Sequence, residues 1–122
     1  MATYIDHAAY YVRDLASTAE IFQKAFGMTV TRVRENPDGR RELWLSGGVQ
    51  LCEKPDFTQD DGRCAHLSLL VEDLEQARSA ALAAGCTPLP KHHWERLPDG
   101  LQLELFAAKS GVIQNLMHME MR

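Results

Sequence analysis

The sequence predicts an α+β fold of two tandem βαβββ modules whose curled sheets enclose a shared cleft. Three observations carry this prediction: an internal repeat, a strand pattern followed by a helix pattern in each copy, and a matching series of turns. Residues 5–15 and 64–74 share a histidine, a valine, an aspartate and a leucine at one offset, so that His7 pairs with His66 at 59 positions (66 − 7). Four identities at a single offset indicate that a structural unit has been duplicated.

Each copy opens with a predicted strand and continues into a predicted helix. Apolar residues alternate along the second copy at Ala65, Leu67, Leu69 and Val71. This period of two places His66 on the opposite face of the strand. Apolar residues then recur at helical spacing, at Leu15, Ala19, Phe22 and Phe26 and again at Leu74, Ala77, Ala81 and Ala84. Ser17 and Glu20 have the spacing of a capping box, and a glycine follows each helix, Gly27 and then Gly85.

Three extended segments follow each helix. They are residues 28–35, 40–45 and 49–53 in the first copy, and residues 87–96, 101–107 and 112–119 in the second. Turn sequences separate them, including Pro-Asp-Gly at 37–39 and at 98–100. We therefore expect one domain over residues 1–122, with a first module at 2–53, a linker at 54–62 and a second module at 63–121. A four-stranded sheet with one helix leaves a face uncovered, so the two sheets are expected to curl around a shared cleft.

Composition and charge exclude several classes of protein. Lys and Arg number 13 against 17 Asp and Glu, a net charge of −4, and the basic residues are scattered, which argues against nucleic acid as a partner. A helix that crosses a bilayer needs about 20 apolar residues, and no apolar run here approaches that length. Residues 1–7 do not resemble a signal peptide. We therefore expect no membrane association and a cytoplasmic location. The three cysteines are far apart, which predicts reduced thiols. Open strand edges predict a homodimer.

The duplicated unit, with a histidine in its first strand and an Asp-Leu helix start, resembles the vicinal oxygen chelate superfamily. That group includes glyoxalase I, methylmalonyl-CoA epimerase, extradiol dioxygenases, fosfomycin-resistance enzymes and the metal-free bleomycin-resistance proteins. The resemblance implies a divalent ion held by a first-strand and a last-strand residue of each module. By position, His7 and His66 match the first-strand ligands. In the last strand of the first module, Gln50 and Cys52 face the cleft, and either could serve.

The last-strand ligand of the second module has three candidates. Glu104 follows the Pro-Asp-Gly turn at 98–100, as the family carboxylate does. That turn, however, aligns with the turn at 37–39, and residues 85–104 leave little room for three strands. We therefore place the last strand at 112–119, with Gln114 as its cleft residue, or Asn115 in the alternative register. Glu104 then becomes a candidate general base or a ligand from the neighbouring strand.

Two functions follow from this site. The first is a metal-assisted enzyme of isomerase, lyase or dioxygenase type, which binds Ni, Zn, Mn or Fe and a small substrate with adjacent oxygens. No organic cofactor is indicated. The second is a metal-free protein that sequesters an organic ligand, which the missing last-strand carboxylate and the negative net charge favour. The residues expected to line the pocket in either case are Tyr11, Trp44, Cys52 and Phe106.

Overall fold

The computed structural model of the chain describes residues 2–58, 62–98 and 100–120. The predicted linker residues 59–61, the turn residue Asp99 and the end of the second module at Met121 lie outside this description. The chain divides into two compact units, a first unit of residues 7–65 and a second unit of residues 1–6 and 66–122. No helix among the described residues is long and apolar enough to cross a bilayer.

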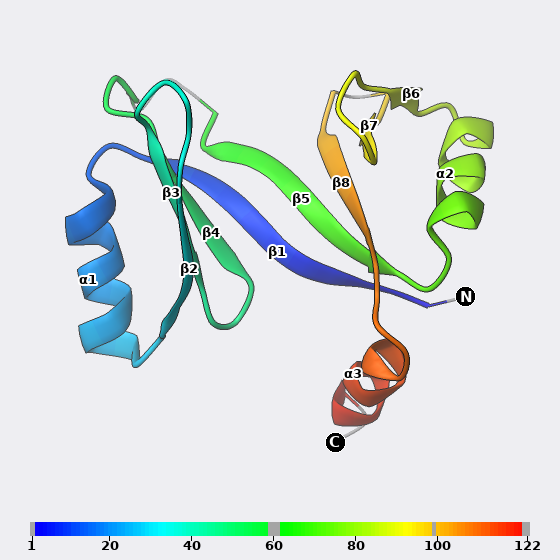
Figure 1. Ribbon diagram of the computed structural model, residues 1–122, viewed down its shortest axis with the longest axis horizontal. Helices are drawn as coiled ribbons and strands as arrows, with labels where there is room; N and C mark the ends of the chain where they lie inside the picture. Colours follow the sequence, from blue (N-terminus) through cyan, green and yellow to red (C-terminus); the bar gives the residue numbers. More distant parts are fainter. Residues whose placement is uncertain (1, 59–61, 99, 121–122) are drawn as a thin grey trace. The chain divides into compact units, whose positions relative to one another are not determined.

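The elements confirm the α+β class and the βαβββ order. They are β1 (Thr3–Val12), α1 (Leu15–Phe26), β2 (Val30–Glu35), β3 (Arg41–Leu45), β4 (Val49–Glu53), β5 (Cys64–Val71), α2 (Leu74–Ala83), β6 (Thr87–Pro88), β7 (Trp94–Arg96), β8 (Gln102–Ala107) and α3 (Val112–Glu120). Figure 1 follows them along the chain. Both helices of the repeat therefore follow directly on the first strand of their copy.

The first unit is a sheet in the order β2-β3-β4-β1, with α1 packed on one face. β2, β3 and β4 are antiparallel, and β1 pairs with β4 in parallel. The helix contributes Leu15 and Ala19 to a core that also contains Leu43, Leu45 and Leu51 from the strands. Because side chains alternate along a strand, the residues between these leucines lie on the face away from the helix.

Helix α1 begins one turn earlier than the capping-box spacing suggested. Its N-cap is Asp14, whose carboxylate accepts a hydrogen bond from the Ser17 backbone N–H at 3.0 Å. Ser17 thus lies inside the first turn, and the predicted box of Ser17 and Glu20 is wrong. Gly27 ends the helix as predicted, with φ of 67°, a left-handed conformation that costs glycine little. Asp73 caps α2 in the same way, by accepting from the Gln76 N–H.

The second unit contains a sheet in the order β5-β8-β7-β6. β5 and β8 are parallel, and the other two pairs are antiparallel. The predicted strand at 87–96 is two short strands, since the chain turns between them at His93, whose φ is 67°. On the helix side of this sheet, the fully buried Glu95 carboxylate lies 3.4 Å from the Arg78 guanidinium of α2.

The predicted last strand at 112–119 is wrong, because these residues form α3. The place beside β5 is already taken by β8, from which the chain continues into α3 (Figure 1). The segment also has a helical rather than an alternating pattern: Ile113 is 1% exposed and Leu116 is half-buried, whereas Gln114 and Asn115 are exposed. The last strand of the second repeat is therefore β8, which carries Glu104.

Candidate functional site

In the first unit, a histidine and a glutamine lie on the sheet face opposite α1. Gln50 is the parallel partner of Ala9 and the antiparallel partner of Trp44. His7, two residues before Ala9, shares its face, and its ring packs edge-on against the Trp44 ring at 6.2 Å between centroids. His7 is 4% and Gln50 2% exposed, so neither is an ordinary surface residue.

The Gln50 amide is held by one end only. Its Nε2 donates a hydrogen bond of 2.7 Å to the Glu42 carboxylate. Its Oε1 is buried, and no described residue donates to it. A buried acceptor without a donor is costly unless a ligand satisfies it, and an amide oxygen can coordinate a hard or borderline cation. The donor set of the first unit, an imidazole and this oxygen, therefore fits a divalent ion.

Glu42 is a functional candidate that the sequence analysis missed. It lies on β3 opposite Cys52, and besides the Gln50 amide it accepts a long contact of 3.7 Å from the Cys52 thiol. A signal was available, since Glu42 and Trp44 alternate with the core residues Leu43 and Leu45. Burial, followed by the charge of Glu42, raises the pKa of Cys52 to about 12. A protonated thiol is a poor metal ligand, which favours Gln50 over Cys52 in that role.

In the second unit, a histidine and a carboxylate lie together. His66 Nε2 is 3.7 Å from Glu104 Oε1, which also accepts a hydrogen bond of 2.6 Å from the Ser68 hydroxyl. Ser68 is fully buried and is the parallel partner of Glu104. Trp94 is the antiparallel partner of Glu104, and its ring packs edge-on against His66 at 4.7 Å between centroids.

The two units therefore contain the same arrangement. In each, an oxygen-bearing side chain on the last strand pairs with the residue two positions after the histidine. On the neighbouring strand the same residue pairs with a tryptophan, and this tryptophan packs against the histidine. By register, Gln50 corresponds to Glu104 and Trp44 to Trp94. Each unit thus offers one imidazole and one oxygen donor.

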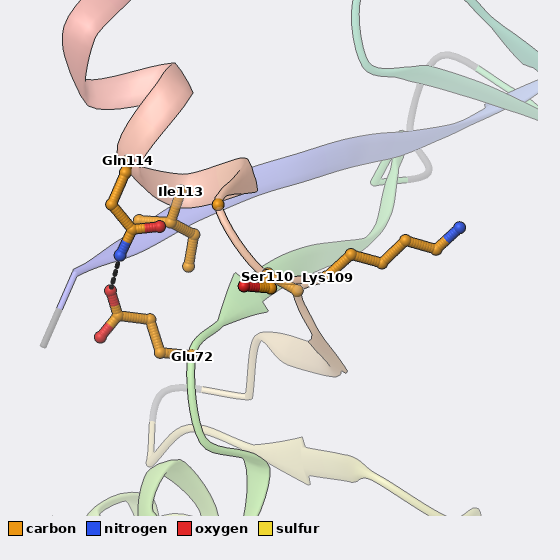
Figure 2. A pocket seen from close by; sticks show the side chains of 7 residues that line it. Glu72, Lys109, Ser110, Ile113 and Gln114 are labelled. Atoms are coloured by element: carbon orange, nitrogen blue, oxygen red, sulfur yellow. Dashed lines mark hydrogen bonds between the residues drawn. The ribbon is translucent and has the colours of Figure 1, made fainter.

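Gln114 has no such position. It lies on α3, where its amide donates to the Glu72 carboxylate at 3.1 Å, as Figure 2 shows. Both residues line a pocket of about 400 Å³ beside the start of the helix, together with Lys109, Ser110 and Ile113. The prediction that Gln114 or Asn115 occupies the last strand is wrong, so neither residue has the placement on which its role as a ligand depended.

The remaining predicted pocket residues are divided between the units. Tyr11 follows His7 and Ala9 on the same face of β1, and Trp44 and Cys52 are close to Gln50 in the first unit. Phe106 is on β8 in the second unit, two residues beyond Glu104, and is 42% exposed.

A comparison with models of protein families identifies the family of this chain. The model of the glyoxalase/bleomycin resistance protein/dioxygenase superfamily matches residues 4–105. The chain belongs to this superfamily. The match confirms the resemblance based on the repeat, and it ends just after Glu104, before α3.

Several solved structures are similar in fold to this chain over most of its length. A hypothetical protein of Bacillus halodurans is 13% identical with a TM-score of 0.65, covering 92% of this chain and 99% of its own. Methylmalonyl-CoA epimerase of Mycobacterium tuberculosis is 23% identical with a TM-score of 0.63, covering 86% and 87%. A Streptomyces coelicolor methylmalonyl-CoA epimerase variant in complex with 2-nitronate-propionyl-CoA is 19% identical with a TM-score of 0.65, covering 90% and 100%. No curated protein matches the chain.

Proposed function

We propose that this superfamily member is a divalent-metal-assisted enzyme that moves a proton on a small substrate with two adjacent oxygens. The proposed ligands are His7, His66 and Glu104, with the Gln50 oxygen as the fourth. The observation that carries the proposal is the correspondence of Gln50 and Glu104, which gives each unit one imidazole and one oxygen donor. A shared cleft between the units stays part of the proposal.

The donor set suits the ions expected from the sequence. Two imidazoles, a carboxylate and an amide oxygen are ligands for Ni, Zn, Mn or Fe, and a four-ligand set leaves positions for two substrate oxygens. The earlier reason for a metal-free binding protein was the lack of a last-strand carboxylate. Glu104 on β8 supplies that carboxylate, so the sequestering function loses its main support.

The bound ion would act as a Lewis acid that stabilises negative charge on the substrate oxygens. The protein residue proposed to move the proton is Glu42. The Glu42 carboxylate lies on the same sheet face as Gln50, whose amide donates the 2.7 Å hydrogen bond that holds it in place. The Glu42 side chain is 16% exposed. Glu42 would remove a proton from the carbon next to a carbonyl, with the electron pair moving onto the carbonyl oxygen.

Return of the proton to the carbon, from either side, would complete an isomerisation. This chemistry needs no oxidant and breaks no carbon–carbon bond, so the isomerase type is the simplest of the three expected types. The solved structures of similar fold support it, since several are methylmalonyl-CoA epimerases and one of these is in complex with methylmalonyl-CoA.

The metal is tested first, on protein purified without chelator. Elemental analysis and calorimetric titration with Ni²⁺, Zn²⁺ and Mn²⁺ should give close to one ion per chain. His66→Ala and Glu104→Gln should weaken binding strongly, whereas Glu35→Gln on β2 should not, because Glu35 points to the other face from Glu42. A wild-type protein that takes up no ion in excess metal would overturn the proposal. That result would favour the alternative function, a metal-free protein that binds an organic ligand.

The proton transfer is tested by exchange with solvent. Methylmalonyl-CoA in D₂O should lose its C2 proton signal faster with the metal-loaded protein than without protein. Glu42→Gln should bind metal within a few fold of the wild type and lose this exchange by about 100-fold or more. Equal exchange rates for Glu42→Gln and wild type would show that Glu42 is not the base.

A further inference from the structure

A pocket of about 400 Å³ lies at the carboxyl ends of β5 and β8 in the second unit. Its volume is within the range of about 300–1,000 Å³ that is typical of small-molecule sites. Glu72, just after β5, lines one side of it, and the segment that joins β8 to α3 lines the other. Ile113 of α3 is 1% exposed and, together with Ala108, gives the pocket an apolar surface.

The pocket is also lined by one carboxylate and one ammonium group that do not pair with each other. Within the described part of the chain, the Gln114 amide is the partner of the Glu72 carboxylate, and Lys109 makes no side-chain hydrogen bond or ion pair. In Figure 2 the Glu72–Gln114 pair lies to the left, and the Lys109 side chain extends to the right, beyond Ser110. The two opposite charges therefore lie on different sides of one pocket.

Hydrogen-bond acceptors and donors are divided between the two sides in the same way. The Gln114 amide uses its Nε2 for the 3.1 Å bond to Glu72, so its Oε1 can accept next to the carboxylate. On the other side, the Lys109 ammonium has only donors, and the Ser110 hydroxyl can donate. One side thus suits a ligand ammonium group, and the other suits a ligand carboxylate.

We infer that this pocket binds a small zwitterion of the amino acid class. The ligand ammonium binds at Glu72 and Gln114, the ligand carboxylate binds at Lys109 and Ser110, and the carbon chain lies on Ile113. A ligand with a single charge leaves one of the two charged side chains without a partner. The net charge of −4 attracts cations in general, so a preference for the zwitterion over an amine alone has to arise from the pocket.

This site is separate from the proposed metal site. Glu72 and Ala108 each follow a residue of that site, Ser68 and Glu104, by four positions. At about 3.3 Å per residue, this spacing is about 13 Å along the strands. The match to the superfamily model ends at residue 105, so the pocket residues at 108–114 follow the matched region. The inference therefore goes beyond the proposed function and does not depend on it.

The test uses two sets of matched compounds, each titrated into the protein as purified and followed by calorimetry. The first set is L-leucine, 4-methylpentanoate, which lacks the amine, and 3-methylbutylamine, which lacks the carboxylate. The second set, with its charges farther apart, is 6-aminohexanoate, hexanoate and pentylamine. We expect at least one zwitterion to bind about tenfold or more tightly than both of its singly charged relatives, because each of them lacks one charge-assisted contact.

Variants with matched charge changes locate the ligand. Glu72→Gln keeps an acceptor for the Gln114 amide but removes the negative charge, and Lys109→Gln removes the positive charge. Each should weaken binding of the preferred zwitterion by about tenfold. The controls are Glu75→Gln and Lys91→Gln, which change exposed residues of the same unit outside the pocket and should leave the affinity unchanged.

Three results would overturn the inference. They are the lack of saturable binding of either zwitterion at millimolar concentration, equal binding of a singly charged relative, and an unchanged affinity in Glu72→Gln or Lys109→Gln. An amino acid that coordinated the proposed metal ion instead would bind equally to both variants, and so gives the third result. Failure of the metal titration would leave this inference standing, and failure here would leave the proposed function standing.

Discussion

Replacement of Ser68 with alanine should weaken both the fold and the proposed metal site. The Ser68 hydroxyl is fully buried and donates a 2.6 Å hydrogen bond to the Glu104 oxygen that lies 3.7 Å from His66. A hydrogen bond to a charged group contributes about 1.5–3 kcal/mol to stability. The Glu104 side chain is 20% exposed, so water can replace part of this bond. We therefore expect a loss of about 1.5 kcal/mol, at the low end of that range.

The same replacement should also lower the metal affinity of the site. Without the hydroxyl, the Glu104 carboxylate loses the donor that orients it, and loss of such an orienting partner costs about 10–100-fold in metal affinity. The first unit shows that alanine fits this position, because Ala9 holds the equivalent place beside Gln50. The variant should therefore fold.

Urea unfolding at pH 7 and calorimetric titration with Zn²⁺ measure the two effects. Ser79→Ala on the exposed side of α2 is the control. Because alanine is the better helix former, this variant should lower neither stability nor zinc affinity. Unchanged zinc affinity in a Ser68→Ala protein that has lost stability would refute the orienting role. Unchanged stability as well would refute the hydrogen bond itself.

Three further predictions follow from other parts of the structure. Arg78→Met should lower the free energy of unfolding, measured in urea, by about 3 kcal/mol, because it leaves the buried Glu95 carboxylate unpaired. Adding Glu95→Met should restore most of this loss. Equal stabilities of the single and double variants would contradict the prediction. The Ser17 backbone N–H lowers the pKa of Asp14, so the cap stabilises α1 above the ordinary pKa of an aspartate and is lost as pH falls through the lowered value. Asp14→Asn should therefore make stability between pH 3 and pH 7, followed by circular dichroism, depend less on pH, and an unchanged slope would count against the cap. Light scattering should report the mass of two chains, since open strand edges favour pairing; a stable monomer at micromolar concentration would exclude the predicted homodimer.

Local patterns were sufficient to predict most of the fold. Alternation and helical spacing within the repeat predicted β1, α1, β4 and β5 to within a few residues, because each is determined by which side chains face the core. The repeat also predicted that His7 and His66 are equivalent first-strand residues on the face away from the helices. Both patterns depend on side-chain burial, which the sequence expresses directly.

The last strand of the second repeat could not be predicted in this way. The turn at 98–100 has the same sequence as the turn at 37–39, but the earlier one joins β2 to β3 whereas the later one joins β7 to β8. Three strands fit between Gly85 and Glu104 because β6 has two residues and β7 has three. Strand lengths this short leave no periodic signal, so the choice between Glu104 and Gln114 depended on tertiary structure.

The parallel pairing of β5 with β8 has a consequence for the order of folding. Parallel neighbours cannot be joined by a tight turn, and Ser68 and Glu104 are 36 residues apart in the chain. Their contact closes a long loop, so it carries a large entropic cost and is expected to form late, after α2 and the hairpins between β6 and β8. An ion held by both His66 and Glu104 would then link β5 to β8 and slow the opening of the second repeat. The proposed metal would in that case determine the kinetic stability of this repeat as well as the chemistry of the site.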